Sequence, residues 1–472
     1  MTEYPIYSAG KFLKTGQQLQ IKNPWNDQPF ALTWKAGNQE LENAIAGALS
    51  IKDQLAKLPA YKRYEVLMDI ATEITSHKEE FTRILSLESA KPWRYAKGEV
   101  ERAIQTFTIA AEESKRLPGD YISIDWTPAG EGKEGIVRYF PVGLIAGISP
   151  FNFPLNLAVH KIAPAIASGC PIILKPSTST PLSTLKLAEI IDQTEIPKGA
   201  VSILPMDRET GNQLVTDERF NLLTFTGSPE VGWKMKKDAG KKKVVLELGG
   251  NAAVVVTKSA DLNSAVKKCV IGGFAYSGQV CIHAQRIYVH KEIYGAFSEK
   301  FIEATKHLKI GDPADPETEI SAMIDEENAI RVENWVNEAV QGGAKILSGG
   351  KRNKTFFEPT VLSETNNQMK VCSLEVFGPV VTLEPFDNFE SVINLVNDSR
   401  YGLQAGVFTN EISEMNYAFE NLHVGGVIIN DVPTFRVDHI PYGGVKDSGL
   451  GREGVKYAIL DMMEPKILVK PR

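Results

Sequence analysis

The chain has 472 residues, of which 43% are hydrophobic and 23% charged, and its formal net charge is −6 at pH 7. This length exceeds what one hydrophobic core usually supports, so two or three domains are expected. The acidic balance argues against a general attraction to nucleic acid or to an anionic membrane surface, and no apolar run approaches the roughly 18 residues of a membrane helix.

The N-terminal segment "MTEYPIYSAGKFLK" lacks the basic and apolar regions of a signal peptide, which predicts a cytoplasmic protein with small-molecule partners. The four cysteines are far apart and form no CxxC pair, which is typical neither of a disulfide scaffold nor of a zinc ribbon. Reduced thiols and no bound metal are therefore expected.

Residues 38–116 have a helical pattern, with apolar residues at spacings of three and four in "LENAIAGALSIKDQLAKL" and "VERAIQTFTIAAEES". The segments "YISIDW" and "GIVRYF" then flank a glycine-rich turn, which predicts a two-stranded ribbon. Such a ribbon is marginal alone, so it is expected to pack on something else.

Short apolar runs follow, from "GLIAGIS" to "VVLELGG", and they alternate with amphipathic segments of helix length. This alternation predicts a mostly parallel sheet with helices on both faces. A second alternating series begins with "AAVVV" and runs to "GGVIIN", so a domain boundary is expected near residue 249. Gly249 and Gly250 are candidates for a sharp turn between the domains.

Read locally, the motifs leave two interpretations each. "LTFTGSPEVG" could bind a phosphate at a helix N-terminus or be an ordinary turn, since G-x-G-x-x-G is absent. Cys281 in "GQVC" could be a nucleophile or an apolar filler, and Asn152 in "PFNFP" an oxyanion donor or a helix cap. Glu247, between leucines, could be a general base with a raised pKa or a paired strand carboxylate.

Taken together, seven segments in order resemble the aldehyde dehydrogenase superfamily over nearly the whole chain: "PFNFPLNL", "LKPSTSTPL", "FTGSPEVG", "LELGGN", "GQVC", "EVFGPV" and "PYGGVKDSGLGREG". The resemblance implies an α/β fold with two doubly wound parallel-sheet domains and a small β oligomerisation ribbon. The implied nucleotide-binding domain covers residues 1–119 and 141–248, and the catalytic domain covers 249–438. The implied ribbon and C-terminal strand are 120–140 and 455–472, in a homodimer or homotetramer.

The implied reaction is the oxidation of an aldehyde to the carboxylic acid with NAD or NADP, through a cysteine thiohemiacetal and a thioester. Cys281 matches the nucleophile, Asn152 the oxyanion donor that acts with the backbone N–H of Cys281, and Glu247 the base that activates water. An acylating or acyl-phosphate branch is the rival enzyme class, which Glu247 argues against. A non-catalytic protein with this fold would be expected to lack one of the three residues.

The resemblance also implies which residues bind the cofactor and which line the substrate tunnel. The implied cofactor residues are Pro150, Phe151, Lys175, Ser177, Thr178, Gly227, Ser228, Glu375 and Phe377. Thr178 stands where members that prefer NAD commonly have a glutamate, so NADP is expected to be favoured or accepted. The implied lining of the aldehyde tunnel is Phe151, Phe153, His160, Tyr276, Ile282, Phe435 and Arg436.

His160 and Arg436 together predict a small polar or anionic aldehyde, such as lactaldehyde, glyceraldehyde or its phosphate, or a dicarboxylic semialdehyde. The alternative for Arg436 is a structural salt bridge with Asp438 or Asp431.

Overall fold

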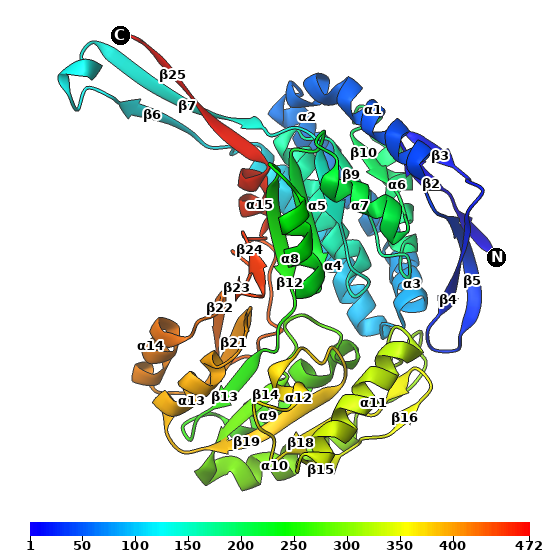
Figure 1. The fold of residues 1–472 in the computed structure, drawn as a ribbon, viewed down its shortest axis with the longest axis vertical. Coiled ribbons are helices and arrows are strands. Elements are labelled where there is room, and N and C mark those ends of the chain that lie inside the picture. The colour runs from blue at the N-terminus through cyan, green and yellow to red at the C-terminus, as the bar shows by residue number, and fades with distance from the viewer.

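The structure, a computed structural model, describes residues 1–472 as two sheet-centred bodies and a projecting ribbon (Figure 1). The larger sheet has eight strands in the order β24-β12-β11-β8-β9-β10-β2-β3. The five central strands are parallel, and the edge strands β24, β2 and β3 are antiparallel to their neighbours. The strands of this sheet are β2 (Ile6–Ser8), β3 (Lys11–Leu13), β8 (Ile145–Ile148), β9 (Ile172–Lys175), β10 (Val201–Ile203), β11 (Leu222–Gly227), β12 (Lys243–Leu248) and β24 (Gly449–Leu450).

Helices cover both faces of this sheet because its central strands bury successive side chains on opposite sides. Ile145 and Ile172 pack into one cluster, whereas the adjacent Ala146 and Ile173 pack into another. The first cluster contacts α2 (Ala60–Ser76), α3 (Lys78–Ser89), α4 (Trp93–Ser114), α5 (Pro154–Ser168), α6 (Leu182–Gln193) and α15 (Val455–Asp461). The second contacts α1 (Asn38–Ala56), α7 (Arg208–Thr216) and α8 (Pro229–Asp238).

The second sheet has seven strands in the order β15-β18-β19-β14-β13-β21-β22, all parallel except β15. Its strands are β13 (Ala253–Val256), β14 (Arg286–His290), β15 (Lys345–Ser348), β18 (Thr360–Ser363), β19 (Val380–Phe386), β21 (Gln404–Phe408) and β22 (Gly426–Ile429). α9 (Leu262–Phe274) and α10 (Lys291–Lys306) pack on one face, and α13 (Phe389–Asn397) and α14 (Ile412–Asn421) pack on the other. The predicted pair of doubly wound sheets is therefore correct.

Smaller elements complete the second body. They are η2 (Ala275–Gly278), α11 (Glu326–Gln341), α12 (Lys370–Ser373), the pair β16 (Arg352–Asn353) and β17 (Phe356–Phe357), and the pair β20 (Tyr401–Gly402) and β23 (Val445–Lys446). None of the helices in the molecule combines the length and the apolar character needed to cross a membrane.

The predicted ribbon is present as β6 (Gly119–Ser123) and β7 (Lys133–Pro141), with the short helix η1 (Pro128–Gly130) between them. The expectation that it pairs with another segment is met by β25 (Met463–Pro471), which lies antiparallel to β7 over nine residue pairs. The three strands project from the larger body, and the C-terminus lies at the far end of the ribbon (Figure 1).

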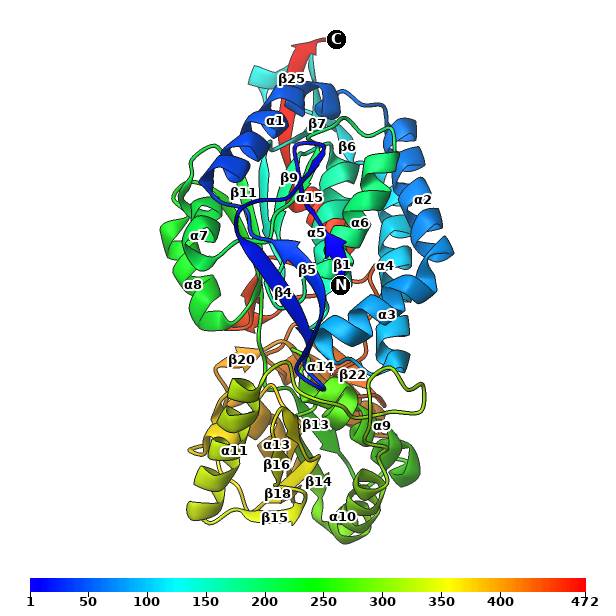
Figure 2. The ribbon, with the colours of Figure 1, turned by 90° about the vertical axis from the view of Figure 1, so that its right-hand side faces the viewer.

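The N-terminal strands are a feature that the sequence analysis missed. β1 (Thr2–Tyr4), β4 (Gln18–Asn23) and β5 (Gln28–Trp34) form a separate three-stranded sheet, and β2 and β3 extend the large sheet. The β4–β5 hairpin runs down the larger body to the second one (Figure 2), where the Pro24 carbonyl accepts a hydrogen bond of 2.9 Å from Thr355 Oγ1. The assignment of strands to sheets does not test the residue boundaries predicted for the domains, so those boundaries stay a prediction.

Candidate active site

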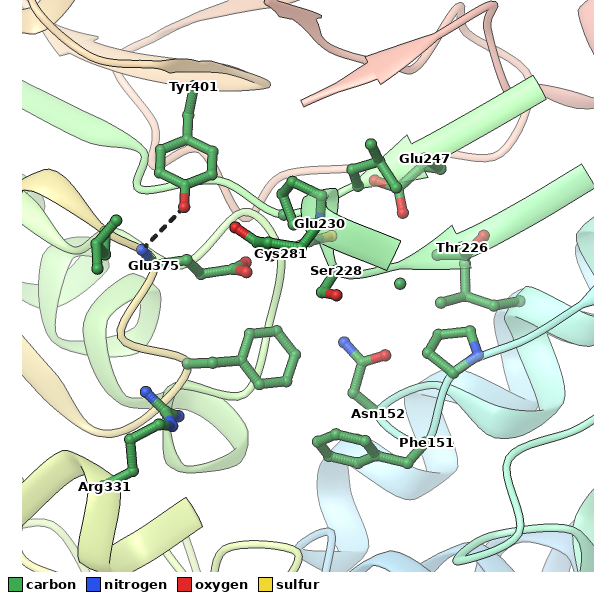
Figure 3. A pocket seen from close by; sticks show the side chains of 18 of the residues that line it. Phe151, Asn152, Thr226, Ser228, Glu230, Glu247, Cys281, Arg331, Glu375 and Tyr401 are labelled. Carbon is green, nitrogen blue, oxygen red and sulfur yellow. Dashed lines mark hydrogen bonds between the residues drawn. The ribbon is translucent and has the colours of Figure 1, made fainter. Parts of the chain in front are cut away.

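A cavity of about 550 Å³ lies between the two bodies, where β8, β11 and β12 end. Carboxyl ends of parallel strands are the usual place for ligand sites in such sheets, because the loops that follow them diverge there. Nine of the residues predicted from the sequence line this one cavity (Figure 3): Pro150, Phe151, Asn152, Gly227, Ser228, Glu247, Cys281, Glu375 and Phe377.

Cys281 follows a turn in which Tyr276, Ser277 and Gly278 all have left-handed backbone conformations, with φ of 50°, 53° and 68°. Such a conformation is costly for the two residues that carry a Cβ atom, so tertiary contacts must hold it. Tyr276 Oη donates to the Ser89 carbonyl at 3.0 Å, and Ser277 Oγ donates to the Ser321 carbonyl at 2.8 Å. These bonds fix the chain that presents the thiol to the cavity.

The Cys281 Sγ lies 3.2 Å from Tyr442 Oη. Burial, and then the nearby Glu247 carboxylate, raise the pKa of this thiol well above its ordinary value, while the contact with Tyr442 opposes the shift. The resting cysteine is therefore a thiol, and it must lose a proton before it can attack a carbonyl carbon.

Glu247 is the second-last residue of β12 and is only 2% exposed. Its Oε1 has no hydrogen-bond partner. Burial first, and then repulsion from Glu453, raise the pKa of Glu247 to about 8, although the cations Arg436 and Lys161 partly oppose this. A buried carboxyl with an unpaired oxygen and a pKa near neutrality has the properties of a general base.

Asn152 lies at the end of the loop before α5 and is 3% exposed. Its Nδ2 donates a hydrogen bond of 3.1 Å to the carbonyl of Gln279, two residues before Cys281. The neutral amide donor is thus held beside the segment that carries the thiol, as a donor for an oxyanion formed there would need to be.

The opposite side of the cavity fits a dinucleotide. Ser228 is the N-cap of α8 but makes no side-chain capping bond, and Pro229 occupies the first turn. The N–H groups of this ten-residue helix are therefore available to an anion at its positive end. Gly227 and Ser228 line the cavity at this point, so the turn predicted from the sequence opens onto it.

Glu375 enters the cavity because Gly249 has no side chain. A Cβ atom on Gly249 would lie 2.0 Å from Glu375 Oε2, and the Gly250 N–H donates to Glu375 Oε1 at 3.0 Å. Neither glycine has a positive φ, so they permit this close approach rather than the sharp turn expected from the sequence. Burial raises the pKa of Glu375 to about 8, and this carboxylate can accept hydrogen bonds from a ribose.

Phe377 has a left-handed φ of 47°, and its ring meets that of Phe151 edge-on at 5.7 Å. Four residues that line the same cavity lie outside all the motifs quoted from the sequence: Arg331, Trp335, Leu374 and Tyr401. Arg331 and Trp335 are four apart on α11, with the guanidinium 4.9 Å from the indole. Their helical spacing was the one available signal, but it did not indicate what the shared face contacts.

Lys175, Ser177 and Thr178 do not line the main cavity. Lys175 is the last residue of β9 and pairs with Ile148 at the end of β8, and Ser177 and Thr178 follow it, so all three stand at the same edge of the sheet. The Lys175 stem lies over Gly211, where a Cβ atom would be 2.7 Å from Lys175 Cε. Ser177 Oγ lies 2.9 Å from Ser179 Oγ, and Thr178 is half-buried.

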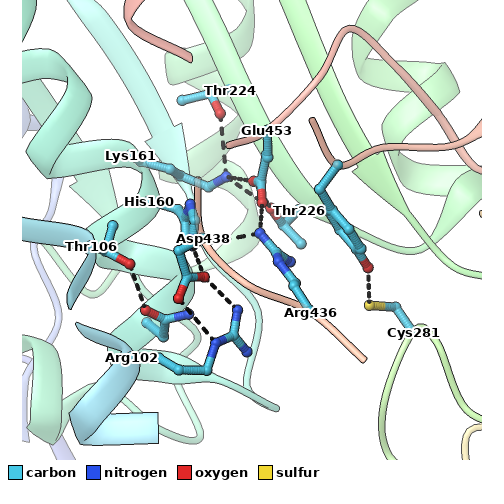
Figure 4. A network of polar contacts seen from close by, with 12 residues as sticks. Arg102, Thr106, His160, Lys161, Thr224, Thr226, Cys281, Arg436, Asp438 and Glu453 are labelled. Atoms are coloured by element: carbon cyan, nitrogen blue, oxygen red, sulfur yellow. Dashed lines mark hydrogen bonds and ion pairs between the residues drawn. The ribbon is translucent and has the colours of Figure 1, made fainter. Parts of the chain in front are cut away.

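The predicted substrate residues are separated. Phe153 and Ile282 belong to an apolar cluster around Tyr276, and Phe435 is 45% exposed. His160 and Arg436 belong instead to a buried network behind Cys281 (Figure 4). His160 Nε2 lies 2.8 Å from Asp438 Oδ1, while burial and the charge of Arg436 lower the pKa of this histidine. The His160 ring is therefore neutral, and its Nε2–H donates to Asp438.

Arg436 does form a buried ion pair, but neither predicted partner is correct. Its Nη2 donates to Glu453 Oε2 at 2.8 Å, because Asp438 binds Arg102 and Asp431 binds Lys268. Lys161 Nζ contacts the other oxygen of Glu453 at 3.4 Å. The Arg436 guanidinium also stacks on Tyr442 at 3.7 Å, and its Nε has no partner.

A second cavity, of about 360 Å³, opens beside this network and is lined in part by Arg102, Gln105, Arg436 and His439. The Tyr442 ring lies between this cavity and the thiol. Its face contacts Arg436, which lines the cavity, and its hydroxyl group contacts Cys281. Tyr442 and Glu453 lie in the segment "PYGGVKDSGLGREG", but their local sequence gave no reason to single them out.

A sequence model of the aldehyde dehydrogenase family matches residues 12–468. The chain is 45% identical to a 3-sulfolactaldehyde dehydrogenase of Priestia aryabhattai, over 99% of this chain and 98% of the relative. A crystal structure of aldehyde dehydrogenase 21 from Physcomitrella patens, bound to its reaction product succinate, is 45% identical and superposes with a TM-score of 0.98, covering 100% of this chain and 98% of that one.

A crystal structure of the glyceraldehyde-3-phosphate dehydrogenase GapN of Methanocaldococcus jannaschii with NADP is 39% identical, with a TM-score of 0.93 and coverage of 97% and 100%. The fold, the cavity and these similarities agree with the resemblance found in the sequence. The chain therefore belongs to the aldehyde dehydrogenase family, whose members oxidise aldehydes with NAD or NADP.

Proposed function

We propose that this chain oxidises a short anionic aldehyde to the carboxylic acid, with Cys281 as the nucleophile. The observation that carries the proposal is the convergence of Cys281, Glu247 and Asn152, from three distant segments, on one cavity beside the uncapped N-terminus of α8. A thiol, a buried carboxyl and a neutral amide donor are the groups that attack, base catalysis and oxyanion stabilisation require.

The Cys281 thiol, whose raised pKa keeps it protonated at rest, gives up its proton to water before it attacks. The thiolate attacks the aldehyde carbon, and the oxygen of the resulting thiohemiacetal is held by Asn152 Nδ2 and the backbone N–H of Cys281. NAD(P), when bound, is the hydride acceptor of the oxidation. After oxidation a thioester remains on Cys281, and Glu247 deprotonates the water that hydrolyses it.

The residues that would hold the cofactor are those whose geometry fits it. The open N–H groups after Gly227 suit the pyrophosphate, the Glu375 carboxylate suits the nicotinamide ribose, and the Phe377 ring suits the nicotinamide face. Lys175, Ser177 and Thr178, at the adjacent strand end, are assigned to the adenosine ribose. Because no carboxylate stands at Thr178, a 2′-phosphate meets Lys175 without repulsion there, which favours NADP.

The test of the mechanism separates its two halves. Cys281→Ser should abolish turnover and leave cofactor binding intact, whereas serine at Cys170, Cys269 or Cys372 should leave most activity. Glu247→Gln, mixed rapidly with aldehyde and NADP, should give a burst of NADPH of up to one per site followed by slow turnover, since the thioester accumulates. More than a few per cent of activity in Cys281→Ser would contradict the proposal.

An anionic substrate is supported by the charges behind the thiol. Lys161, Arg102 and Arg436 face two carboxylates, Glu453 and Asp438. Lys161 and Arg436 lower the pKa of Glu453 to about 2, and His160 and Arg102 lower the pKa of Asp438. The network therefore carries one more positive than negative charge while Glu247 is protonated. The unpartnered Nε of Arg436 is a free donor within this excess.

Two relatives support the same substrate class. The 3-sulfolactaldehyde dehydrogenase acts on a sulfonate, and the P. patens enzyme releases succinate. Arg436 lines the second cavity and stacks on Tyr442, whose hydroxyl group contacts Cys281, so its charge lies near both the cavity and the thiol. Succinic semialdehyde and sulfolactaldehyde should therefore have higher kcat/KM than butyraldehyde and lactaldehyde, and the reverse order would contradict an anionic substrate.

A second copy of the chain is the partner that the ribbon supports. β25 is an edge strand that pairs only with β7, and its Ile467, Leu468 and Val469 are about half exposed; an exposed apolar edge favours association. Leu468→Asp should lower the oligomeric state measured by light scattering. The four free cysteines support a reducing compartment, the cytoplasm.

A further inference from the structure

The connection between α3 and α4 lies directly behind the cavity and contains a buried lysine. Lys91 is 0% exposed, and its Nζ forms an ion pair with Glu99 on α4. The same Nζ donates to the backbone carbonyl of Asn152 at 2.6 Å. An ammonium group so fully removed from water is costly unless all its donors are used, so these partners are integral to the fold.

Glu99 links this ion pair to the helix that follows Asn152. Its Oε1 accepts hydrogen bonds from the N–H groups of Leu155 and Asn156, at 3.0 and 3.1 Å, in the first turn of α5. The carboxylate therefore caps α5 from a distant helix, where its charge is favourable. Asn152 is thus held from both sides, by the ammonium group on its own carbonyl and by the capped helix after it.

Lys91 also contacts the segment that carries the thiol. Its Nζ lies 4.0 Å from the ring centre of Phe153 and 4.6 Å from that of Tyr276. Tyr276 is the first left-handed residue of the turn before Cys281, and its hydroxyl group donates to Ser89, two residues before Lys91. One buried cation therefore touches the Asn152 loop and the Cys281 turn, which come from the two different bodies.

We infer that Lys91 is a positioning residue, which sets the Asn152 amide donor against Cys281 through its bond to the Asn152 carbonyl and its contacts with Phe153 and Tyr276. The inference rests on the proposed role of Asn152 as oxyanion donor. Lys91 touches neither the cavity nor a reacting atom. Its effect on the reaction passes through the placement of other groups.

Removing the cation should shift the Asn152 loop, because the Asn152 carbonyl loses its donor and Glu99 loses its counter-ion. A displacement of an oriented group by about 1 Å can lower a rate by about a hundredfold, so a loss of about ten- to a hundredfold is expected for Lys91→Met. The step affected is the formation of the thioester, seen as the NADPH burst. Cofactor binding should change little, because the pyrophosphate and ribose groups are assigned to the N-terminus of α8 and to Glu375, away from Lys91.

The experiment is a double-mutant cycle on the burst rate, with Lys91→Met made in the unaltered enzyme and in Asn152→Ala, each with NADP and succinic semialdehyde. If Lys91 acts through Asn152, its replacement lowers the burst rate in the unaltered enzyme and changes it less than about twofold in the Asn152→Ala background. An equal loss in both backgrounds would overturn the inference, as would an unchanged burst rate in Lys91→Met.

Glu88→Gln is the matched control. Glu88 is buried and accepts the N–H groups of Leu182 and Ser183 at 2.7 and 3.1 Å, so it caps α6 as Glu99 caps α5, but it does not contact Asn152. This variant should lower the melting temperature and leave the burst rate unchanged. If Lys91→Met does not fold, Lys91→Gln, which keeps one donor, enters the same cycle with the same outcomes.

The cycle distinguishes this inference from the proposed function. If Asn152→Ala alone leaves the burst rate unchanged, the oxyanion role of Asn152 is wrong, and the mechanism must be revised before Lys91 is considered. If Asn152→Ala slows the burst and Lys91→Met slows it equally in both backgrounds, the mechanism stands and the positioning role of Lys91 is wrong.

Discussion

Replacing Arg436 by leucine should separate the recognition of an anionic substrate from the chemistry at Cys281. Arg436 stacks on Tyr442 and has a free Nε toward the network behind the thiol, but it lines the second cavity and not the first. The variant keeps Cys281, Glu247 and Asn152. Its effect on an aldehyde should therefore depend on whether that aldehyde carries a negative charge.

The magnitude follows from the interaction that is lost. A hydrogen bond to a charged group contributes about 1.5–3 kcal/mol, so kcat/KM for succinic semialdehyde should fall about 10- to 150-fold. Butyraldehyde has the same number of carbon atoms and no carboxylate, so its kcat/KM should change little. Arg436→Lys keeps the charge but loses the planar guanidinium group. Its kcat/KM for succinic semialdehyde should therefore lie between that of the unaltered enzyme and that of Arg436→Leu.

A second consequence affects both aldehydes equally. The Arg436 charge lowers the pKa of Glu247, which burial and Glu453 hold at about 8. Without Arg436 this pKa rises further, and Glu247 acts as a base only when it is ionised. The pH at which the rate is half-maximal should therefore move upward for succinic semialdehyde and for butyraldehyde alike.

The assay measures kcat, which reports the pH shift of thioester hydrolysis, and kcat/KM for each aldehyde with saturating NADP, as functions of pH for the unaltered enzyme and both variants. Rates are compared on the alkaline plateau, where the shift of Glu247 no longer contributes. Equal losses for the two aldehydes on that plateau would refute the reasoning, because Arg436 would then serve only to hold Glu453.

Three further predictions concern the general base and the residues assigned to the cofactor. With a Glu247 pKa of about 8, thioester hydrolysis should rise with pH through about 8 in single-turnover experiments, and Glu247→Gln should abolish this rise; an unchanged profile would assign it to another group. Thr178→Glu should lower kcat/KM with NADP about tenfold, or by about 1.4 kcal/mol, and leave kcat/KM with NAD nearly unchanged. A strong NAD preference already present in the unaltered enzyme would show that other residues bind the adenosine ribose. Gly249→Ala should raise the KM for either cofactor several-fold, since a Cβ atom 2.0 Å from Glu375 Oε2 must displace that carboxylate. The control is Gly16→Ala, where a Cβ atom has no neighbour within 4 Å, and this variant should behave like the unaltered enzyme.

The sequence alone determined the architecture of both sheets. Buried parallel strands are continuous apolar runs such as "NLLTFTG" and "AAVVV", and the amphipathic segments between them have the length of crossover helices. This alternation of strands and helices can therefore be recognised from local sequence alone. The sequence did not reveal β1 to β5, because β1, β2 and β3 have only three residues each, too few to show a period, and β4 has mixed burial and few apolar residues. Such strands are defined by their partners.

The candidate site divides in the same way. Cys281, Glu247 and Asn152 could be named because each lies in a motif that matches the family which the sequence resembles, and the structure places all three on one cavity. The partner of Arg436 could not be found, because Asp431 and Asp438 are nearer in sequence than Glu453 and yet are bound by Lys268 and Arg102.

Lys91 illustrates the same limit most clearly. In the sequence it is one of many lysines, and lysine is ordinarily a surface residue. Only the packing of α4 against α5, and of the Cys281 turn against Ser89, excludes water around its ammonium group and surrounds it with a carboxylate, a carbonyl and two rings. Local patterns determine which residues form an element, whereas the desolvation and pairing of charges depend on contacts between residues far apart in the chain, and these only the tertiary structure decides.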